Sequence, residues 1–376
     1  MSTRRGDGGE RSGATYAATG VDVVGLEPGL GKLVSRLAAT NAFPRRGRPV
    51  LPNGFFANVL DLGNNLGLAI STDGVGTKLL VALALSRFDT IAIDLIAMNV
   101  NDVLCVGAEP IALVDYVAVS STDPVLLDQL AAGLVEGARQ ARISIPGGEI
   151  AQVRELLRPH PPDGREGFDV VATAVGVVPL DRVIVGRDVR PGDVVLGLPS
   201  SGIHSNGLTL ARLVLAGEDG AGYAERPRAL GGPSVGDELL RPTRIYVREV
   251  MALLDAGVDV KALAHITGDG LLNLLRIAAS DVGFVLDTLP PVPPIFQLIA
   301  ERGGVTSAEM HTTFNMGVGF CVVVAAAEAE RALGLLRELE PGTSVLGRAV
   351  ADAERKMVLP GPGLVGTGKT FAPARR

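Results

Sequence analysis

The sequence predicts an α/β (α+β-like) protein of two domains, and three observations support this fold class. Its 376 residues are too many for one domain, because domains commonly hold about 100 to 200 residues. From residue 66 onward, short β-branched runs alternate with segments of helical periodicity, which is typical of α/β folds. A connecting segment near residues 180–190 separates two sets of such elements of similar size.

The first set of elements is expected to form the core of the N-terminal domain. A largely buried helix is predicted over residues 89–108, with Asp89 or Thr90 as its N-cap. Asp123 and Pro124 supply an N-cap and a first-turn proline for a second helix. The predicted strands of this set are 66–72, 111–120, 143–150 and 168–178.

The second set opens with a strand over 189–200, followed by a helix from about residue 207. Further strands are expected in VKALAHIT, VGFVLDTL, MGVGFCVVVA and TSVLGRAV. Further helices are expected in DELLRPTRIYVREVMALLDAG, LLNLLRIAA, PPIFQLIAERG and AEAERALGLLREL. We therefore divide the chain into a disordered leader (1–15), an N-terminal domain (16–185), a C-terminal domain (186–355) and a flexible tail (356–376).

Composition excludes several classes of partner. The chain carries 35 basic and 41 acidic residues, a balance that argues against nucleic-acid binding, which requires a basic surface. The longest apolar run, 318–327, is shorter than the about 18 residues needed to span a membrane. The first 15 residues lack the apolar core of a signal peptide, and Cys105 and Cys321 stand in apolar surroundings typical of a reducing compartment. We expect a cytoplasmic protein with no nucleic-acid or membrane partner.

The strongest local signal for chemistry is STDGVGTK, residues 71–78. It follows a predicted strand, and Gly74 and Gly76 mark a turn that exposes backbone N–H groups between Asp73 and Lys78. Exposed amides, a carboxylate for Mg²⁺ and a lysine are the groups that phosphate binding requires. The alternative is an ordinary turn between a strand and a helix, and the spacing alone does not decide between them.

Two further carboxylates stand in unusual places. Asp102 lies on an otherwise apolar helix, where an ionised carboxylate is costly to bury unless it is paired or bound to metal. Glu149 ends the motif PGGE beside a predicted strand. With Asp73 they form a set of three carboxylates that suffices to place Mg²⁺ against a triphosphate. Taken alone, Asp102 fits a satisfied internal hydrogen bond equally well.

Two loops in the C-terminal half carry polar side chains between glycines. SSGIHSNG, residues 200–207, offers Ser201, His204, Ser205 and Asn206; histidine in such a loop suits proton transfer or charge stabilisation, whereas Ser205 or Asn206 can equally cap the next helix. AHITGDG, residues 264–270, places His265 at a strand end, with Thr267, Gly268 and Asp269 entering a helix, a position that suits a phosphate or a plain N-cap.

One motif matches a phosphate-binding pattern without its context. GLVGTGKT, residues 363–370, fits the P-loop pattern G-x-x-x-x-G-K-[ST]. Prolines precede it and only FAPARR follows, so neither the buried strand nor the helix of a P-loop is expected. We therefore predict a flexible tail that binds no nucleotide in the P-loop manner; the alternative is a tail that folds back so that Lys369 contacts phosphate.

In combination, these stretches resemble the aminoimidazole ribonucleotide synthetase family, whose members are also called phosphoribosylformylglycinamidine cyclo-ligases. The resemblance covers roughly residues 16–352 and includes the D-x4-G-A-x-P signature at Asp102 to Pro110. It is carried, in this order, by YAATGVDV, STDGVGTK, IDLIAMNVNDVLCVGAEPIALVDYVA, GGE, GDVVLGLPSSGIHSNGL, LLRPTRIYV, AHITG and TFNMGVGFCVVV.

The resemblance implies a fold, a partner and a reaction. The expected molecule is a homodimer whose N-terminal strands combine into an intersubunit barrel, with nucleotide bound near the interface. The expected enzyme uses ATP and Mg²⁺ to close formylglycinamidine ribonucleotide into aminoimidazole ribonucleotide during purine synthesis. ATP phosphorylates the formyl oxygen, the ring nitrogen attacks that carbon, and phosphate departs, so positioning and charge stabilisation supply most of the rate.

Carried over by position, the resemblance also assigns roles to residues. The expected nucleotide site comprises Asp73, Gly74, Gly76, Thr77, Lys78, Asp102 and Glu149. The expected Mg²⁺ ligands among them are Asp73, Asp102 and Glu149. The expected substrate-binding residues are Ser201, His204, Ser205, Asn206 and Thr267. The expected catalytic residues are Asp102, His204 and Lys78, with Lys78 on a phosphate and His204 at the reacting amide.

The sequence departs from the family pattern at three places. LPNGFFANV, residues 51–59, stands where many relatives have a glycine-rich loop expected to fold over substrate or ATP. Ile150 follows GGE in place of threonine, and TGDG replaces TGGG, which adds Asp269 near a presumed phosphate. A carboxylate there repels phosphate unless a cation intervenes. Such changes fit a divergent member of the same ATP-binding superfamily that acts on another substrate.

Other members of the superfamily and a different class of protein are the remaining alternatives. Selenophosphate synthetase carries a reactive cysteine in its N-terminal glycine loop, the hydrogenase-maturation relative ends in a cysteine-containing tail, and thiamin-phosphate kinase lacks the HSNG loop; the sequence matches none of these patterns. A non-catalytic nucleotide-binding dimer is the alternative of another class. Against it stand five retained residues: Asp73, Lys78, Asp102, Glu149 and His204.

Overall fold

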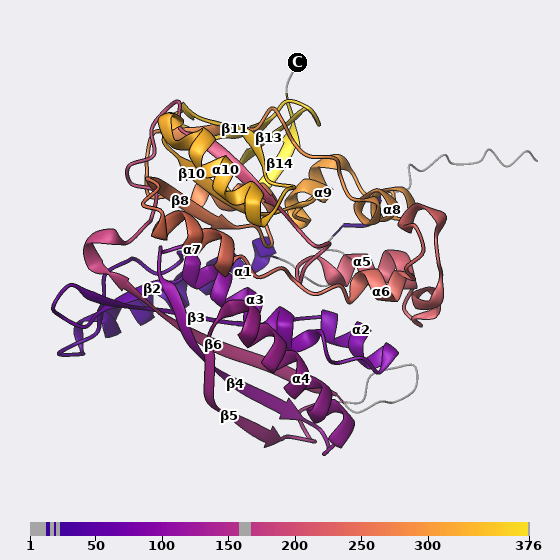
Figure 1. Ribbon diagram of the computed structural model, residues 1–376. Coiled ribbons are helices and arrows are strands. Elements are labelled where there is room, and N and C mark those ends of the chain that lie inside the picture. Colours follow the sequence, from indigo (N-terminus) through magenta and orange to yellow (C-terminus); the bar gives the residue numbers. More distant parts are fainter. Residues whose placement is uncertain (1–12, 16–18, 20–22, 158–166, 375–376) are drawn as a thin grey trace, which may run out of the picture.

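Two α/β units, each built on one sheet, make up the described part of the chain. The computed structural model describes residues 13–15, 19, 23–157 and 167–374, so the leader expected over 1–15 lies almost entirely outside the described residues. Figure 1 shows the N-terminal unit in indigo and magenta and the C-terminal unit in orange and yellow, with α3 between them. No helix among the described residues is long and apolar enough to cross a membrane.

The N-terminal unit contains a six-stranded sheet in the order β1-β2-β3-β6-β4-β5. Its strands are β1 Arg48–Pro49, β2 Asn58–Asp61, β3 Leu66–Gly74, β4 Glu109–Val119, β5 Ser144–Gln152 and β6 Phe168–Pro179. All neighbours pair antiparallel except β4 and β5, which are parallel. Along β6, Ala172 and Ala174 are buried whereas Val171 is exposed, because successive side chains of a strand point to opposite faces.

The described part of this unit also contains helices, of which α3 packs directly on the sheet and α4 packs on α3. They are α1 Val23–Ala38, α2 Lys78–Leu85, α3 Ile91–Leu104 and α4 Pro124–Ala141, with a 3-10 helix η2 Ala39–Ala42 after α1. As the sequence predicts, Asp123 accepts the amides of Val125 and Leu126 at the start of α4. Thr90 precedes α3 without making a side-chain capping bond. Gly133 lets α4 approach α3, since a Cβ there would lie 2.1 Å from the Asp89 carbonyl oxygen.

The C-terminal unit contains an eight-stranded sheet in the order β14-β13-β12-β9-β11-β7-β10-β8. Its strands are β7 Val194–Pro199, β8 Val260–His265, β9 Val282–Val285, β10 Val318–Val324, β11 Ser344–Ala351, β12 Met357–Leu359, β13 Leu364–Thr367 and β14 Thr370–Pro373. Every residue of β10 is buried. The long apolar run of the sequence is therefore a central strand of this sheet.

The helices of the C-terminal unit differ from the sequence prediction at two places. They are α5 Leu208–Ala216, α6 Val235–Leu239, α7 Val247–Asp255, α8 Pro294–Gly303, α9 Ser307–Thr313 and α10 Ala329–Leu339, with 3-10 helices η3 Leu180–Arg182, η4 Ala221–Ala224, η5 Arg228–Leu230, η6 Gly270–Arg276 and η7 Ala326–Glu328. The single helix expected around DELLRPTRIYV is broken into α6 and α7, because Pro242 disfavours helix in the residue before it. LLNLLRIAA forms 3-10 helix in η6 and no α-helix.

The flexible tail expected over residues 356–376 is wrong. β12 pairs parallel with β9, and β13 and β14 continue the sheet as antiparallel neighbours. Pro360 and Pro362 lie in the turn between β12 and β13, where no ladder hydrogen bond is lost. Gly368 has a φ of +61° in the turn before β14, and Phe371 is buried edge-on against His311. GLVGTGKT therefore lies in a β-hairpin, which lacks the helix of a P-loop, as the sequence predicts.

Candidate active site

Three segments from both units meet at one place in the interior of the molecule. They are the end of β3, one face of α3 and the end of β8, which bring together Asp73, Asp102 and His265. Asn99 of α3 donates to the Asp73 carbonyl oxygen at 3.2 Å and so ties the strand end to the helix. This meeting point contains two of the carboxylates that the sequence singles out.

Asp73 and Asp102 interact electrostatically. Burial and the negative charge of Asp102 raise the pKa of Asp73 from its ordinary value of 3.8 to about 6, although the Gly74 amide and His265 act in the opposite direction. The Gly74 N–H donates to Asp73 Oδ1 at 2.7 Å. Two carboxylates that repel each other in this way are stabilised by a shared cation.

His265, which the sequence places at a strand end in AHITGDG without assigning it a role, is the third residue of this site. Its Nδ1 lies 3.0 Å from Asp102 Oδ1, and its side chain is fully buried. Its backbone N–H donates to Cys105 Sγ at 3.2 Å, and Asn101 Nδ2 lies 3.4 Å from its Nε2. His265 therefore fixes the orientation of the Asp102 carboxylate. Its place at a strand end before Thr-Gly-Asp-Gly is the signal that identifies it from sequence.

Lys78 does not face a phosphate site, contrary to the expectation. Its side chain is fully buried, and its Nζ lies 2.8 Å from Asp94 and donates to the Arg241 carbonyl oxygen at 2.6 Å. Burial lowers the pKa of Lys78, and Asp94 counteracts that effect. Because helix α2 begins at Lys78, its side chain projects from the first turn into the interface between the two units. The charge of Lys78 is therefore balanced by Asp94 in the interior.

Asp94 is the centre of the resulting polar network. Its Oδ1 accepts the Thr243 N–H at 2.7 Å, the Thr243 hydroxyl at 2.5 Å and the Ser205 hydroxyl at 3.2 Å. We call Lys78, Asp94, Thr243 and Ser205 the buried hub. It joins helices α2 and α3 of the N-terminal unit to two loops of the C-terminal unit. Ser205 therefore has a partner in the interior, contrary to its expected role in binding substrate.

The structure buries the ring of His204, the residue expected at the reacting amide, and leaves its Nδ1 without a hydrogen-bond partner among the described residues. Its ring is 2% exposed and packs near Tyr246. Its Nε2 accepts the Ser201 N–H at 3.2 Å, so the proton of the neutral ring is on Nδ1. Burial lowers the pKa of His204 well below its usual range, and nearby His265, Lys78 and Arg244 add to this effect. A neutral, buried ring stabilises its own loop.

The remaining predicted substrate residues lie on both sides of this loop. The Ser201 hydroxyl donates to the Pro242 carbonyl oxygen at 2.6 Å. Asn206 Nδ2 is buried and has no hydrogen-bond partner among the described residues, and Asn206 Oδ1 is close to Gly268, 3.6 Å from where a Cβ would lie. The Thr267 N–H donates to Asn273 Oδ1 at 2.8 Å. Asn206 is therefore the member of this set with an unused donor.

The glycine turn of STDGVGTK has the expected backbone shape. Gly76 has a φ of +70°, a conformation that glycine adopts without steric cost, and Gly76 is exposed. Thr77 Oγ1 lies 2.9 Å from Thr209 Oγ1 of helix α5, which gives a second contact between the units. The turn thus presents the backbone around Gly74 and Gly76 beside Asp73.

Glu149 does not join Asp73 and Asp102 within one chain, which corrects the expected set of three metal ligands. In register across the sheet, Asp73 pairs with Ala172, Ala172 with Asp115, and Asp115 with Gly148. Three strand spacings separate β3 from β5, a distance of about 14 Å. No group of three or more His, Cys, Asp or Glu side chains arranged to hold a metal occurs among the described residues.

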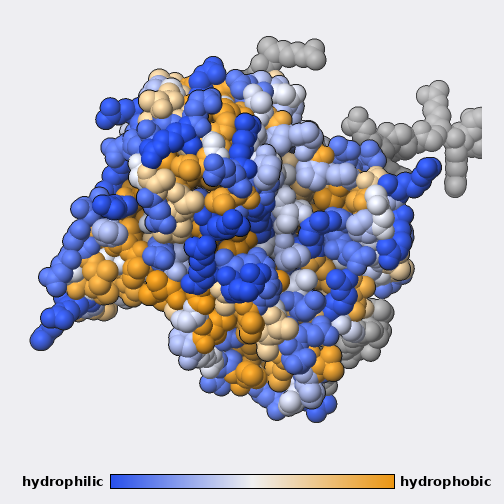
Figure 2. Space-filling view, viewed as in Figure 1, coloured by the Kyte–Doolittle hydropathy of each residue, from blue (hydrophilic) through white to orange (hydrophobic). Residues whose placement is uncertain are grey.

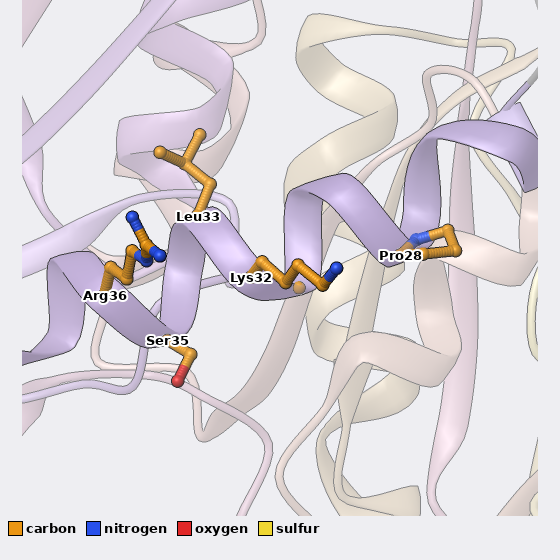
Figure 3. Close-up of a pocket in the computed structure, with 6 residues that line it drawn as sticks. Pro28, Lys32, Leu33, Ser35 and Arg36 are labelled. Carbon is orange, nitrogen blue, oxygen red and sulfur yellow. The ribbon is translucent and has the colours of Figure 1, made fainter.

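A hollow elsewhere on the surface carries none of the predicted site residues. It has a volume of about 890 Å³ and lies along α1. Figure 3 shows the side chains of Pro28, Lys32, Leu33, Ser35 and Arg36 that line it. It contains neither carboxylate nor histidine, so we place the candidate site at Asp73 and Asp102.

Removing one partner of the buried hub is expected to destabilise the protein strongly. Asp94→Asn leaves the Lys78 ammonium without its counter-charge in the interior, which should lower the free energy of unfolding by about 3 to 5 kcal/mol. Urea unfolding followed by circular dichroism measures this loss. The exposed pair Arg348 and Asp287 gives the control, since Asp287→Asn should cost less than about 1 kcal/mol. Equal losses in both variants would contradict a special role for the hub.

The pKa of Asp73 predicts a pH-dependent gain in stability for Asp73→Asn in metal-free protein. Above pH about 6 the carboxylate is ionised in the folded state against burial and Asp102, so the variant should be more stable than wild type by up to about 3 kcal/mol. The gain should shrink as the pH falls from about 6 towards 3.8, where the folded-state carboxyl is already protonated. Urea unfolding in EDTA at a pH of about 4.5, 6 and 8 tests this prediction. Asp128→Asn on the surface of α4 is the control.

Two family models match the two units of the chain. The model described as AIR synthase related protein, N-terminal domain, matches residues 56–178. The model described as AIR synthase related protein, C-terminal domain, matches residues 190–359. Together the two models span the strands from β2 to β12.

Similar solved structures show the same fold. Hydrogenase maturation protein HypE in complex with ATP has a TM-score of 0.58 at 20% identity and covers 92% of this chain and 95% of that chain. T. maritima PurL complexed with ATP has a TM-score of 0.52 at 16% identity, covering 84% of this chain and 45% of that chain.

Similar sequences show the family more specifically. The phosphoribosylformylglycinamidine cyclo-ligase of Methanothermobacter thermautotrophicus is 48% identical over 323 residues, 86% of this chain and 91% of the relative. The protein of the same name from Thermococcus kodakarensis is 49% identical over 324 residues, with the same two shares. These relatives confirm the resemblance seen in the sequence, and the chain belongs to the phosphoribosylformylglycinamidine cyclo-ligase family.

Proposed function

We propose that Asp73 and Asp102 form the centre at which this chain uses ATP to close formylglycinamidine ribonucleotide into aminoimidazole ribonucleotide. The reaction is the one for which its relatives are named. In the first step the formyl oxygen of the substrate attacks the γ-phosphorus of ATP and ADP leaves. In the second step a nitrogen of the same substrate attacks the formyl carbon, the C–N bond closes the ring, and the C–O bond breaks as phosphate departs.

The observation that carries this proposal is the coupling of the two aspartates. Burial and, after it, the charge of Asp102 raise the pKa of Asp73 to about 6, so the two carboxylates interact in a partly dry site. Oxygen ligands of this kind suit Mg²⁺, so the residues present fit the metal. When bound, Mg²⁺ offsets the charge of the ATP phosphates.

The other residues of the site act by orientation. His265 holds the Asp102 carboxylate, and the Gly74 N–H holds that of Asp73. The backbone turn at Gly76 lies directly after Asp73 and offers amides to a phosphate. Asn206 Nδ2 has no partner among the described residues and is the donor that we assign to the ribonucleotide, near Gly268 and Thr267. Such fixed donors accelerate a reaction by positioning its partners.

We also propose that the chain forms a homodimer through the uncovered face of its N-terminal sheet. Leu66, Val114, Tyr116 and Val171 are all exposed on this face, and register places Tyr116 opposite Val171. Figure 2 shows orange side chains over the lower part of the molecule, where Figure 1 places β2 to β6. An exposed apolar sheet face is typical of an interface. Glu149 pairs with Tyr116 and so lies on the same face.

Turnover by purified protein tests the proposed reaction. Wild type incubated with ATP, Mg²⁺ and formylglycinamidine ribonucleotide should release ADP together with the aromatic amine product. Asp102→Asn should lower kcat by about 100-fold or more, because it removes charge stabilisation in the transition state, while circular dichroism stays unchanged. ATP binding without product would favour the divergent paralogue or the non-catalytic nucleotide-binding dimer, and unchanged kinetics of the variant would remove Asp102 from the site.

A charge placed on the exposed sheet face tests the dimer. Val114 is 46% exposed on β4, and Val135 is 71% exposed on α4. Val114→Asp should halve the mass measured by light scattering, because a buried unpaired carboxylate opposes association. Val135→Asp is the matched control and should leave the mass unchanged. A monomeric wild type, or a Val114→Asp dimer, would contradict this interface.

A further inference from the structure

The loop before β2 lies at the same end of the sheet as Asp73. Strands β2 and β3 are antiparallel, with Asn58 opposite Ile70. The chain that precedes Asn58 therefore runs beside the chain that follows Ile70, and that chain leads to Asp73. This loop contains FFA of LPNGFFANV, one of the three places where the sequence departs from the family pattern.

The same loop contacts the C-terminal unit through Phe56. The guanidinium carbon of Arg276 lies 4.9 Å from the centre of the Phe56 ring, the arrangement of a cation–π contact. Phe55 packs edge-on against Phe56 with ring centres 5.3 Å apart, and Phe56 is buried. The aromatic ring thus holds one side of the Arg276 guanidinium.

Asp269 holds Arg276 from another side. Its Oδ2 accepts Arg276 Nη2 at 3.3 Å. Asp269 has a φ of +71°, a left-handed conformation that costs an L-residue roughly 1 kcal/mol or more and that glycine adopts freely. Aspartate places a side chain at this position where glycine would place none, and that side chain contacts Arg276. TGDG, another departure from the family pattern, therefore contacts the same arginine as Phe56 of LPNGFFANV does.

A phosphate at this end of the sheet needs a cation that Lys78 does not supply. Lys78 is buried and neutralised by Asp94, while Asp73 and Asp102 add negative charge. Arg276 is 36% exposed and engages Asp269 through one nitrogen, which leaves other donors of its planar fork for an anion. Arginine recognises phosphate with two parallel hydrogen bonds.

Arg276 and Asp102 both interact electrostatically with one buried thiol. Burial, and after it Asp102, raise the pKa of the Cys105 thiol well above its usual range, and Arg276 acts in the opposite direction. Both charges therefore reach the same buried thiol beside His265.

We propose that Arg276 binds a phosphoryl group at the Asp73 and Asp102 site, and that Asp269 and Phe56 hold its guanidinium in place. The group is either the terminal phosphate of ATP or the phosphate of the ribonucleotide. The proposal rests on the cyclisation reaction proposed above. It also resolves the charge conflict expected at TGDG, because Asp269 is paired with an arginine and does not face the phosphate alone.

Steady-state kinetics of the full-length protein test the assignment. Arg276→Gln should raise KM for one of the two phosphorylated substrates by about 10-fold to 100-fold, the loss expected for hydrogen bonds to a charged group. A change in KM for ATP identifies the nucleotide phosphate, and a change in KM for the ribonucleotide identifies the other source. Arg348→Gln is the matched control, because Arg348 also pairs with one aspartate, Asp287, at 3.3 Å. It should leave both KM values unchanged.

Three more variants separate binding from folding. Arg276→Lys keeps the charge without the fork and should give an intermediate KM. Asp269→Gly removes the left-handed strain and the ion pair, and Phe56→Leu removes the ring but keeps apolar volume; each should raise the same KM by about twofold to fivefold. Thermal unfolding of all variants shows whether each is folded.

The outcome that overturns the proposal is specific. Suppose that wild type turns over, that Arg276→Gln is folded, and that both of its KM values equal those of Arg348→Gln. Arg276 then does not bind phosphate. A lower kcat of Arg276→Gln with unchanged KM values leads to the same conclusion. If wild type gives no product, the proposed reaction fails instead. Direct titration of Mg-ATP by calorimetry then still tests the nucleotide phosphate, since loss of ATP affinity in Arg276→Gln supports the assignment and unchanged affinity contradicts the nucleotide as its source.

Discussion

The ion pair between Lys78 and Asp94 is the interaction on which the arrangement of the two units depends. Both side chains are fully buried, and a charge in that position is costly unless its partners are fixed. Asp94 also binds Thr243 and Ser205, so the helices of one sheet and the loops of the other share one set of hydrogen bonds. The loop that contains His204 is therefore held at Ser205 by the Asp94 carboxylate and at His204 by the Ser201 N–H.

Helix α3 extends this constraint to the carboxylate site. Asp94, Asn101 and Cys105 lie seven and four residues apart and so share a face of the helix. Asn101 donates to the Arg244 carbonyl oxygen and accepts the Tyr246 N–H, and Cys105 accepts the His265 N–H. One helix thus positions the interface and, through Asp102, the site beside it. Asp94, Asn101 and Asp102 of this buried helix each have a partner in the other unit, whereas Asn99 binds the end of β3 within its own unit.

Much of the fold follows from the sequence, and the exceptions have physical reasons. Periodicity identifies the long strands and helices, and the Asp123 cap is seen directly. The strands after residue 356 were missed because they span three or four residues between prolines and glycines, too few to show alternation. Asp73 and Asp102 were found because aspartate is conspicuous in such surroundings. Lys78, Ser205 and His204 are predicted to bind ligands because local sequence does not show which partners the fold gives them, namely Asp94 for Lys78 and Ser205, and the Ser201 N–H for His204. The sequence does not single out Asp94, and it places His265 at a strand end without showing that its ring meets Asp102 of the other unit.

The C-terminal hairpin has a consequence for solubility. β14 is the outermost strand of the eight-stranded sheet, and an edge strand exposes backbone groups that can recruit a strand from another molecule. It is four residues long and ends at Pro373, a residue without a backbone N–H to offer. A short edge that ends in proline discourages sheet-to-sheet aggregation. The segment that matches a nucleotide-binding motif in the sequence thus forms β13 and the turn that leads into this protected edge strand.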